Sequence, residues 1–274
     1  MNRLANVLQN NKESHQGVFM AGTVPGFPDL ETSFEIAKTI IEAGADILEL
    51  SASSYNPVAD GPTLQHAHSH VLTQGISKEQ IFRLYKRIRS AFQSTPFFVV
   101  EYADCVYRSG VREYYQQLTE SGVDSLLIPD LLLEESAPFL EMANTHKISQ
   151  IFIIDPATSD ELILKLSAMN STFLYIRTVT GVTGQREQFL QETTDFIKRV
   201  KQTTPLPLIA GFGISKPEHV KQMLSAGVDG VVTCSAIINL IKESKTSKME
   251  MQKQLQDYII GMKNATFPSF FSNL

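Results

Sequence analysis

The sequence predicts a (β/α)8 barrel that forms one domain over residues 1–274. Eight short apolar runs alternate with eight amphipathic segments, which is the order of strands and helices in this fold. A tetrapeptide pattern also recurs three times at the joints between them. The length of 274 residues could hold two average domains, but α/β barrels of this size commonly form one.

The predicted strands are continuous runs of Ile, Val, Leu and Phe, as expected for parallel strands that are covered on both faces. In chain order they are Val18–Ala21, Ile47–Leu50, Phe97–Tyr102, Ser125–Pro129, Ile151–Ile154, Thr172–Ile176, Leu206–Ala210 and Gly230–Thr233. A doubly wound open sheet is the alternative fold. We disfavour it because no Gly-x-Gly-x-x-Gly motif follows the first strand.

The predicted helices lie between these strands and carry apolar residues at helical spacing. They are Leu30–Ala43, Lys78–Ala91, Val111–Ser121, Ala137–Thr145, Asp160–Met169, Glu187–Gln202, Pro217–Ala226 and Ala236–Lys242. Residues 249–265 are expected to form a further helix that closes the barrel, and residues 266–274 a loosely held tail.

The recurring tetrapeptide marks the passage from a helix to the next strand. It reads Ala43-Gly-Ala-Asp46, Ser121-Gly-Val-Asp124 and Ala226-Gly-Val-Asp229. Glycine suits the left-handed position that ends a helix, and a short loop then leads into a buried strand. The same joint used three times indicates a chain that alternates β and α.

Composition narrows the class of protein. The net charge of −5 and the pI near 5.7 argue against nucleic acid or an anionic membrane as the main partner. No apolar run approaches the roughly 18 residues that span a bilayer, and the N-terminus is too polar for a signal peptide. Cys105 and Cys234 are expected to be free thiols in a reducing cytosol. We therefore expect a cytoplasmic enzyme.

Two carboxylates mark a candidate catalytic site after the second predicted strand. Glu49 lies near the end of this apolar strand, and Asp60 follows eleven residues later in a loop. Two acids at the carboxyl end of a barrel strand suit acid/base chemistry, because one can stay protonated while the other stays charged. A structural role is the alternative for each: a buried, hydrogen-bonded glutamate, and an aspartate that serves an Ala-Asp-Gly-Pro turn.

A second group of motifs predicts a phosphate site. Gly211-Phe-Gly213 follows the seventh predicted strand, and Ser235-Ala-Ile237 begins a helix after the eighth. Backbone amides of a glycine turn and the N-terminus of a helix together bind anions in many such barrels. The Thr/Gly loop from Thr178 to Gly184 could cover a substrate or be an ordinary surface loop.

Other motifs do not favour additional chemistry. His66 and His70 lie one helical turn apart, but no carboxylate or cysteine has ligand spacing to them, so we predict a solvated helix face and no metal site. Cys105 has no nearby base in the sequence and is expected to be unreactive. No lysine ends an apolar strand, which argues against Schiff-base aldolase chemistry.

The chain resembles the tryptophan synthase alpha subunit family from Leu4 to Lys242. The matching motifs, in the family's order and spacing, are Ala43-Gly-Ala-Asp-x-Leu-Glu49, Asn56-Pro-x-Ala-Asp-Gly-Pro62, Asp130 with Glu134-Glu-Ser-Ala-Pro138, Gly181-Val-Thr-Gly184, Gly211-Phe-Gly-Ile-Ser215 and Ser235-Ala-Ile237. The resemblance implies a lyase that cleaves indole-3-glycerol phosphate to indole and glyceraldehyde 3-phosphate.

The resemblance also implies a role for each site residue. Glu49 would protonate C3 of indole, Asp60 would hold the indole N–H, and Tyr175 would line the site near Glu49. The implied indole pocket is Val100, Leu127 and Ile153, and the implied phosphate-binding residues are Thr183, Gly184, Gly211, Phe212, Gly213, Cys234 and Ser235. The chain would need no metal or organic cofactor. Its partner would be a β subunit that carries pyridoxal phosphate.

The chain departs from the family pattern mainly in two loops. Residues 24–28 lose the family's acid, and residues 51–56 lose its proline and aspartate. Cys234 also replaces a glycine of the phosphate cradle. Three hypotheses follow: a working lyase with altered coupling to the β subunit, a catalytically weak protein that mainly binds and activates a β subunit, or a lyase for a related indole or aryl glycerol phosphate.

Overall fold

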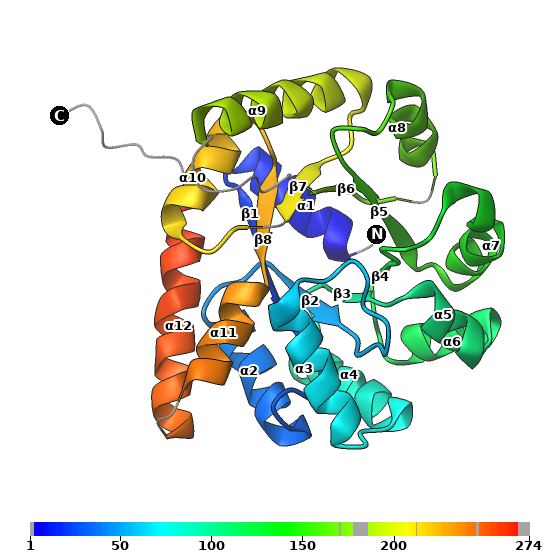
Figure 1. Cartoon of the computed structure of the whole chain (residues 1–274), viewed down its shortest axis with the longest axis vertical. Helices are drawn as coiled ribbons and strands as arrows, with labels where there is room; N and C mark the ends of the chain where they lie inside the picture. Colours follow the sequence, from blue (N-terminus) through cyan, green and yellow to red (C-terminus); the bar gives the residue numbers. More distant parts are fainter. Residues whose placement is uncertain (1–2, 170, 178–185, 212, 245–246, 268–274) are drawn as a thin grey trace.

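A computed structural model shows a closed barrel of eight parallel strands in the order β1 to β8, surrounded by helices (Figure 1). The structure describes residues 3–169, 171–177, 186–211, 213–244 and 247–267, with the backbone alone for residues 186–190. The strands are β1 (Val18–Thr23), β2 (Ile47–Ser51), β3 (Phe97–Val100), β4 (Ser125–Leu127), β5 (Ser149–Ile154), β6 (Leu174–Arg177), β7 (Leu208–Gly211) and β8 (Gly230–Thr233). The predicted fold and all eight predicted strands are confirmed.

The helices form the outer layer. They are α1 (Arg3–Glu13), α2 (Leu30–Glu42), α3 (Pro62–Thr73), α4 (Lys78–Ala91), α5 (Ala103–Ser109), α6 (Val111–Glu120), the 3-10 helix η1 (Leu133–Glu135), α7 (Ala137–His146), α8 (Asp160–Ser167), α9 (Arg186–Thr203), α10 (Pro217–Ala226), α11 (Ser235–Glu243) and α12 (Lys248–Asn264). All predicted helices are present, and α12 is the expected closing helix. Of the predicted tail, residues 268–274 lie outside the described part of the chain. No helix within the described ranges has the length and apolar character to cross a membrane.

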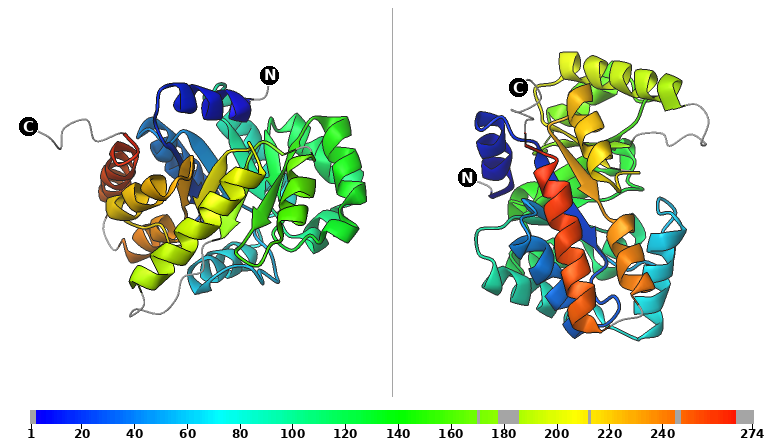
Figure 2. Two further views of the ribbon diagram at one scale, coloured as in Figure 1. Left: turned by 90° about the horizontal axis from the view of Figure 1, so that it is seen from above. Right: turned by 90° about the vertical axis from the view of Figure 1, so that its left-hand side faces the viewer.

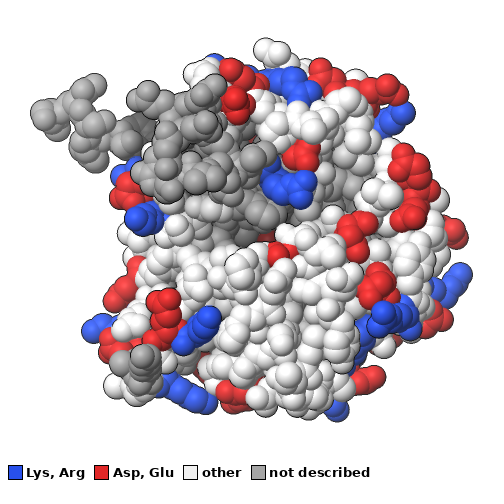
Figure 3. Space-filling view, in the orientation of Figure 1, with Lys and Arg blue, Asp and Glu red and all other residues white. Residues whose placement is uncertain are grey.

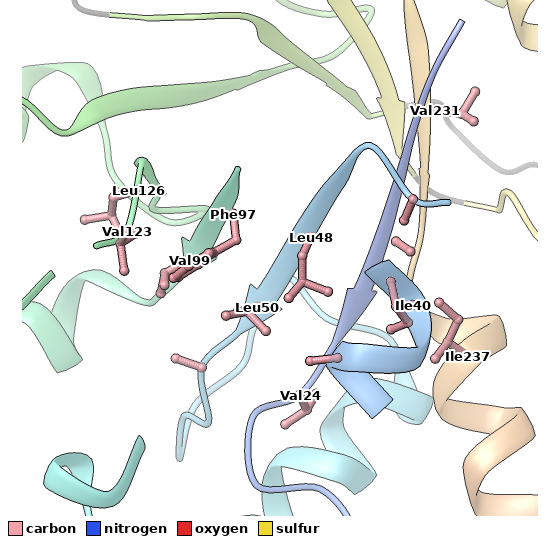
Figure 4. Packing of buried hydrophobic residues seen from close by; sticks show 14 of the residues in the cluster. Val24, Ile40, Leu48, Leu50, Phe97, Val99, Val123, Leu126, Val231 and Ile237 are labelled. Carbon is pink, nitrogen blue, oxygen red and sulfur yellow. The ribbon is translucent and has the colours of Figure 1, made fainter. Parts of the chain in front are cut away.

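Side chains alternate between two cores along each strand. Phe98 of β3 faces the barrel interior, together with Ile47 of β2 and Leu127 of β4. Phe97 and Leu48 instead face the helices, and Figure 4 shows this outer core between the strands and α2 and α11. Because the side-chain period of a strand is two residues, Glu49 shares the inward face of β2 with Ile47.

Helix α1 covers the amino-terminal end of the barrel. Its Leu4 and Leu8 pack into the barrel interior. Figure 2 shows α1 and α3 at opposite ends of the strands in its left view. The βα loops, where this fold carries its chemistry, therefore lie on the side away from α1.

The recurring tetrapeptide ends a helix as predicted, and its aspartate has a second role. Gly44, Gly122 and Gly227 have φ angles of +104°, +72° and +109°, which a residue with a Cβ rarely adopts. The aspartate two residues later accepts a backbone N–H from a neighbouring strand. These bonds join Asp46 to Phe19, Asp124 to Phe97 and Asp229 to Leu208, at 2.7, 3.0 and 2.7 Å. Each joint thus holds two strands together.

Candidate active site

A cavity of about 360 Å³ lies at the carboxyl ends of the strands. It contains both carboxylates that the sequence singled out, Glu49 and Asp60. The predicted indole-pocket residues Val100, Leu127 and Ile153 also line it, each from a different strand, and Tyr175 enters from β6. The structure therefore brings these six side chains together, although they are spread over more than 120 positions of the sequence.

Glu49 is a buried acid in an apolar barrel. Its side chain is almost fully buried, and Oε2 has no hydrogen-bond partner among the described residues. Burial first, and the charge of Asp60 second, raise the pKa of Glu49 from 4.5 to about 8. Gly22 of β1 makes room for it, because a Cβ there would lie 2.7 Å from Oε1 of Glu49. The carboxyl is thus protonated at neutral pH and can donate a proton.

Asp60 lies in a polar setting at the same cavity. Its Oδ2 accepts a hydrogen bond of 2.7 Å from the hydroxyl of Tyr102 and lies 3.1 Å from Nε2 of His68. Tyr102 immediately precedes α5, and His68 is fully buried on α3. The backbone N–H of Ala59 donates to the same tyrosine hydroxyl at 3.1 Å. These contacts fix the position of the Asp60 carboxyl group.

The ring of Tyr175 explains why position 211, the first glycine of the Gly211-Phe-Gly213 motif, carries no side chain. A Cβ on Gly211 would lie only 2.0 Å from the Tyr175 hydroxyl, so the strand must carry glycine here for the ring to fit. Burial, followed by the charge of Glu49, raises the pKa of Tyr175 well above its ordinary value. Gly211 lies against the tyrosine ring and does not line the cavity with Gly213.

The far side of the cavity offers donors for an anion. Gly213, with a φ of +76°, and Ser235, the first residue of α11, both line it. Cys234 precedes that helix and places its Sγ 2.9 Å from the site of a Cβ on Gly22, on the Glu49 side of the cavity. Helix amino-termini carry free N–H groups and positive potential. The predicted residues Thr183, Gly184 and Phe212 lie outside the described residues.

Three side chains of the site were missed by sequence reasoning. Arg177, at the end of β6, lines the cavity and pairs with Asp155 at 2.7 Å. Tyr102 and His68 hold Asp60. The sequence does contain a signal for His68, because Leu64, His68 and Val71 lie on one buried face of α3. Our expectation of a solvated face for His66 and His70 holds for His66. His70 is half-buried, and its Nε2 lies 2.9 Å from the backbone oxygen of Pro28.

The remaining candidates for chemistry are inert or solvated. The described residues contain no group of three His, Cys, Asp or Glu side chains that could hold a metal. Burial raises the pKa of the Cys105 thiol to about 12, so it is protonated and unreactive at neutral pH. Both cysteines are free.

Comparison with known proteins identifies the family of this chain. A family model described as tryptophan synthase alpha chain matches residues 8–267. The chain belongs to this family. The tryptophan synthase alpha chain of Methanothermobacter thermautotrophicus is 39% identical over 247 residues, which cover 90% of this chain and 91% of that one. The alpha chain of an Escherichia coli O7:K1 strain is 35% identical and covers 97% of this chain and 99% of its own.

Solved structures agree as well. Tryptophan synthase subunit alpha from Legionella pneumophila superposes with a TM-score of 0.89 at 25% identity, over 97% of this chain and 98% of that chain. The tryptophan synthase alpha family cleaves indole-3-glycerol phosphate to indole and glyceraldehyde 3-phosphate, so this chain is a lyase of tryptophan biosynthesis. The resemblance seen in the sequence is confirmed, and the hypotheses of a mainly β-activating protein or a lyase for another substrate are not favoured.

Proposed function

We propose that the cavity around Glu49 is the site of this cleavage, with Glu49 as the acid and Asp60 as the group that holds the indole N–H. The observation that carries the proposal is the burial of Glu49, whose Oε2 has no hydrogen-bond partner among the described residues, together with its pKa of about 8. Such a carboxyl keeps its proton at neutral pH and can donate it, while Asp60 is held at the same cavity by a hydrogen bond from Tyr102.

The protons of the reaction balance with Glu49 as the group that gives a proton and later takes one up. Glu49 gives its proton to C3 of the indole ring, and positive charge develops on the ring nitrogen beside Asp60. The substrate hydroxyl then loses its proton as the carbon–carbon bond breaks, and the bonding electrons return to the ring. Glu49, now a carboxylate, is the group able to take up that proton. The indole ring itself accepts the electrons, so this proposal needs no cofactor in the chain.

The rest of the cavity suits the two ends of the substrate. Val100, Leu127 and Ile153 offer an apolar wall for the flat ring system. We assign the phosphate to the amides near Gly213 and Ser235, where a helix begins.

The test is indole release from indole-3-glycerol phosphate by the purified chain. Glu49→Gln keeps the size of the side chain and removes its acid, so kcat should fall by at least about a hundredfold, since acid–base catalysis contributes about 10²–10⁴. Glu161→Gln, which changes an exposed carboxylate on α8, should leave the rate unchanged. Undiminished turnover in Glu49→Gln would exclude the assignment.

We also propose a β subunit as partner, bound to an apolar surface on the second, third and fourth βα loops. This surface, the loop patch, consists of Tyr55, Val58, Tyr107 and Leu132, exposed by 78, 64, 49 and 61%. Figure 3 shows that the face over α3 and the neighbouring loop carries few charged side chains. Contiguous exposed apolar side chains on a monomer usually mark an interaction site.

The partner proposal is tested by co-elution with a tryptophan synthase β chain. Tyr55→Ser with Val58→Ser should weaken the complex by about tenfold or more, because central aromatic contacts dominate such interfaces. Leu164→Ser removes an exposed leucine of α8, away from the loop patch, and should not change binding. Equal binding by both variants would place the interface elsewhere.

A further inference from the structure

A second cavity lies on the other side of the barrel wall from the active site. It encloses about 210 Å³ and shares no lining residue with the active-site cavity. Its walls come from α3, α4, α5, α6 and the loop after β2, and Glu101 lies in the wall beside β3. We call it the Glu101 cavity.

Glu101 faces this cavity because of strand alternation. Phe97 and Val99 point to the helix layer, and Glu101 is two residues further along the same face. The side chain is 3% exposed. Its Oε1 accepts the backbone N–H of Tyr102 at 3.0 Å, and its Oε2 accepts the hydroxyl of Tyr114 at 3.2 Å. A buried carboxyl outside the catalytic site costs stability, and the cleavage reaction does not use it.

The strongest sign of an occupant is the hydroxyl of Tyr85. This side chain is 1% exposed, lines the Glu101 cavity, and its hydroxyl has no hydrogen-bond partner among the described residues. Buried hydroxyls are almost always paired, and an unpaired one costs about 1–3 kcal/mol. The Glu101 carboxyl lies close enough to influence its titration. The Tyr85 hydroxyl and the remaining lone pairs of the Glu101 carboxyl are therefore available to a ligand in this cavity.

The other walls determine the size and kind of ligand. Val71, Leu72 and Ile81 are aliphatic, and Phe82 is aromatic. An apolar cavity of about 150 Å³ is large enough to bind benzene, so 210 Å³ accommodates one ring or two fused rings. An apolar wall with few convergent polar groups is the usual composition of a small-molecule site.

Lys78 and Arg108, the two cations that line the Glu101 cavity, do not make it a site for an anion. Lys78 Nζ already donates to the backbone oxygen of Cys105 at 3.0 Å and to Ser109 Oγ at 2.7 Å. Arg108 lies 3.3 Å from the carboxylate of Asp104. Both cations are thus neutralised or engaged, and the cavity favours an uncharged molecule.

We propose that the Glu101 cavity binds a small, neutral aromatic molecule of one or two fused rings that carries an N–H or O–H group. The ring lies among Val71, Ile81 and Phe82, and its polar group reaches Glu101 and the hydroxyl of Tyr85. The site is separate from the catalytic one. Tyr102 lies between the two, since its N–H bonds Glu101 and its hydroxyl bonds Asp60.

The position of the ligand is the first test. Crystals of the full chain soaked in 5-bromoindole should show anomalous bromine signal beside Phe82 and Ile81, because the bromine marks each site that the ring occupies. Signal at the catalytic cavity is compatible with the proposal, since an indole binds there too. Bromine at the catalytic cavity alone, or only water in the Glu101 cavity, would overturn the proposal without affecting the proposed reaction.

Binding in solution is the second test. Titration calorimetry with indole should give two sites, with a second dissociation constant of about 0.1–10 mM for a ligand of this size. Leu72→Trp fills the cavity and should leave one site, whereas Leu164→Trp on α8 should keep both. Tyr85→Phe should weaken the second site at least about threefold, since one hydrogen bond is lost. A single site in the unaltered chain, or two sites in Leu72→Trp, would overturn the proposal.

Discussion

Glu49 and Asp60 are two acids of one cavity that have different surroundings. Glu49 Oε2 has no partner among the described residues, whereas Asp60 accepts a hydrogen bond from Tyr102. Burial disfavours charge on Glu49, so its carboxyl is protonated at neutral pH. The proposed proton transfer to carbon needs a donor in this form.

The pKa of Glu49 predicts the pH dependence of the reaction. The acid is active when protonated, so kcat should be constant below the raised pKa of about 8 and fall tenfold per pH step above it. Single-turnover cleavage of indole-3-glycerol phosphate between pH 6 and 10 measures this profile. A rate that stays level through pH 9 would show that Glu49 is not the proton donor.

The hydroxyl of Tyr102 should matter for catalysis although we assign it no chemical step. Tyr102→Phe removes the 2.7 Å bond to Asp60, and hydrogen bonds to charged groups contribute about 1.5–3 kcal/mol. The expected result is a fall in kcat of roughly 10- to 100-fold, with a smaller change in KM. Tyr115→Phe is the matched control, because its buried hydroxyl bonds Gln150 on the far side of β5 from the site. A change confined to KM would contradict this role.

At the level of elements, the three aspartates of the repeated joint tie strands and helices together. Asp124 is the most buried of them. It accepts the N–H of Phe97 and forms ion pairs with Arg89 at 2.7 Å and Arg3 at 2.8 Å. Removal of one partner of a buried ion pair leaves the other charge without compensation, at a cost of about 3–5 kcal/mol.

Asp124→Ala should therefore lower the free energy of unfolding by about 3 kcal/mol or more. Asp104→Ala, which breaks an exposed pair with Arg108 on α5, should change it by less than about 1 kcal/mol. Urea denaturation followed by circular dichroism compares the two. Similar losses of unfolding free energy in both variants would mean that the aspartate of the joint contributes little to stability.

The helices and strands also show how much of the structure could be predicted from the sequence. Strands and covering helices were predicted because each buries a regular apolar face, and Lys78–Ala91 and Pro217–Ala226 match α4 and α10 at both ends. Helix α1 was missed because only Leu4 and Leu8 of its residues are buried. The acids of the site were predicted from motifs, and its apolar wall was implied by the family resemblance. The contacts of Tyr102 and His68 with Asp60 were not predicted, because they join residues that are distant in the sequence; the spacing of His68 on α3 indicates burial but not its partner.

For the molecule as a whole, the buried Glu49 carboxyl that serves the proposed reaction makes the free energy of unfolding depend on pH. The unfolded chain releases the Glu49 proton near pH 4.5, whereas the folded chain holds it up to about pH 8. Stability from this group is therefore complete below pH 4.5, decreases as the pH rises, and is lost above pH 8. Glu101, whose pKa burial raises to about 7, adds a contribution of the same sign.

Glu49→Gln removes this dependence, because the amide stays neutral at every pH. The variant should gain stability over the unaltered chain as the pH rises from 5 to 9, with a difference on the order of several kcal/mol at pH 9. Thermal denaturation at both pH values measures the gain, and Glu161→Gln on the surface of α8 serves as the control. Because the same change abolishes proton donation, stability at alkaline pH and activity should move in opposite directions. An equal effect of Glu49→Gln at pH 5 and pH 9 would mean that the folded barrel does not hold this proton.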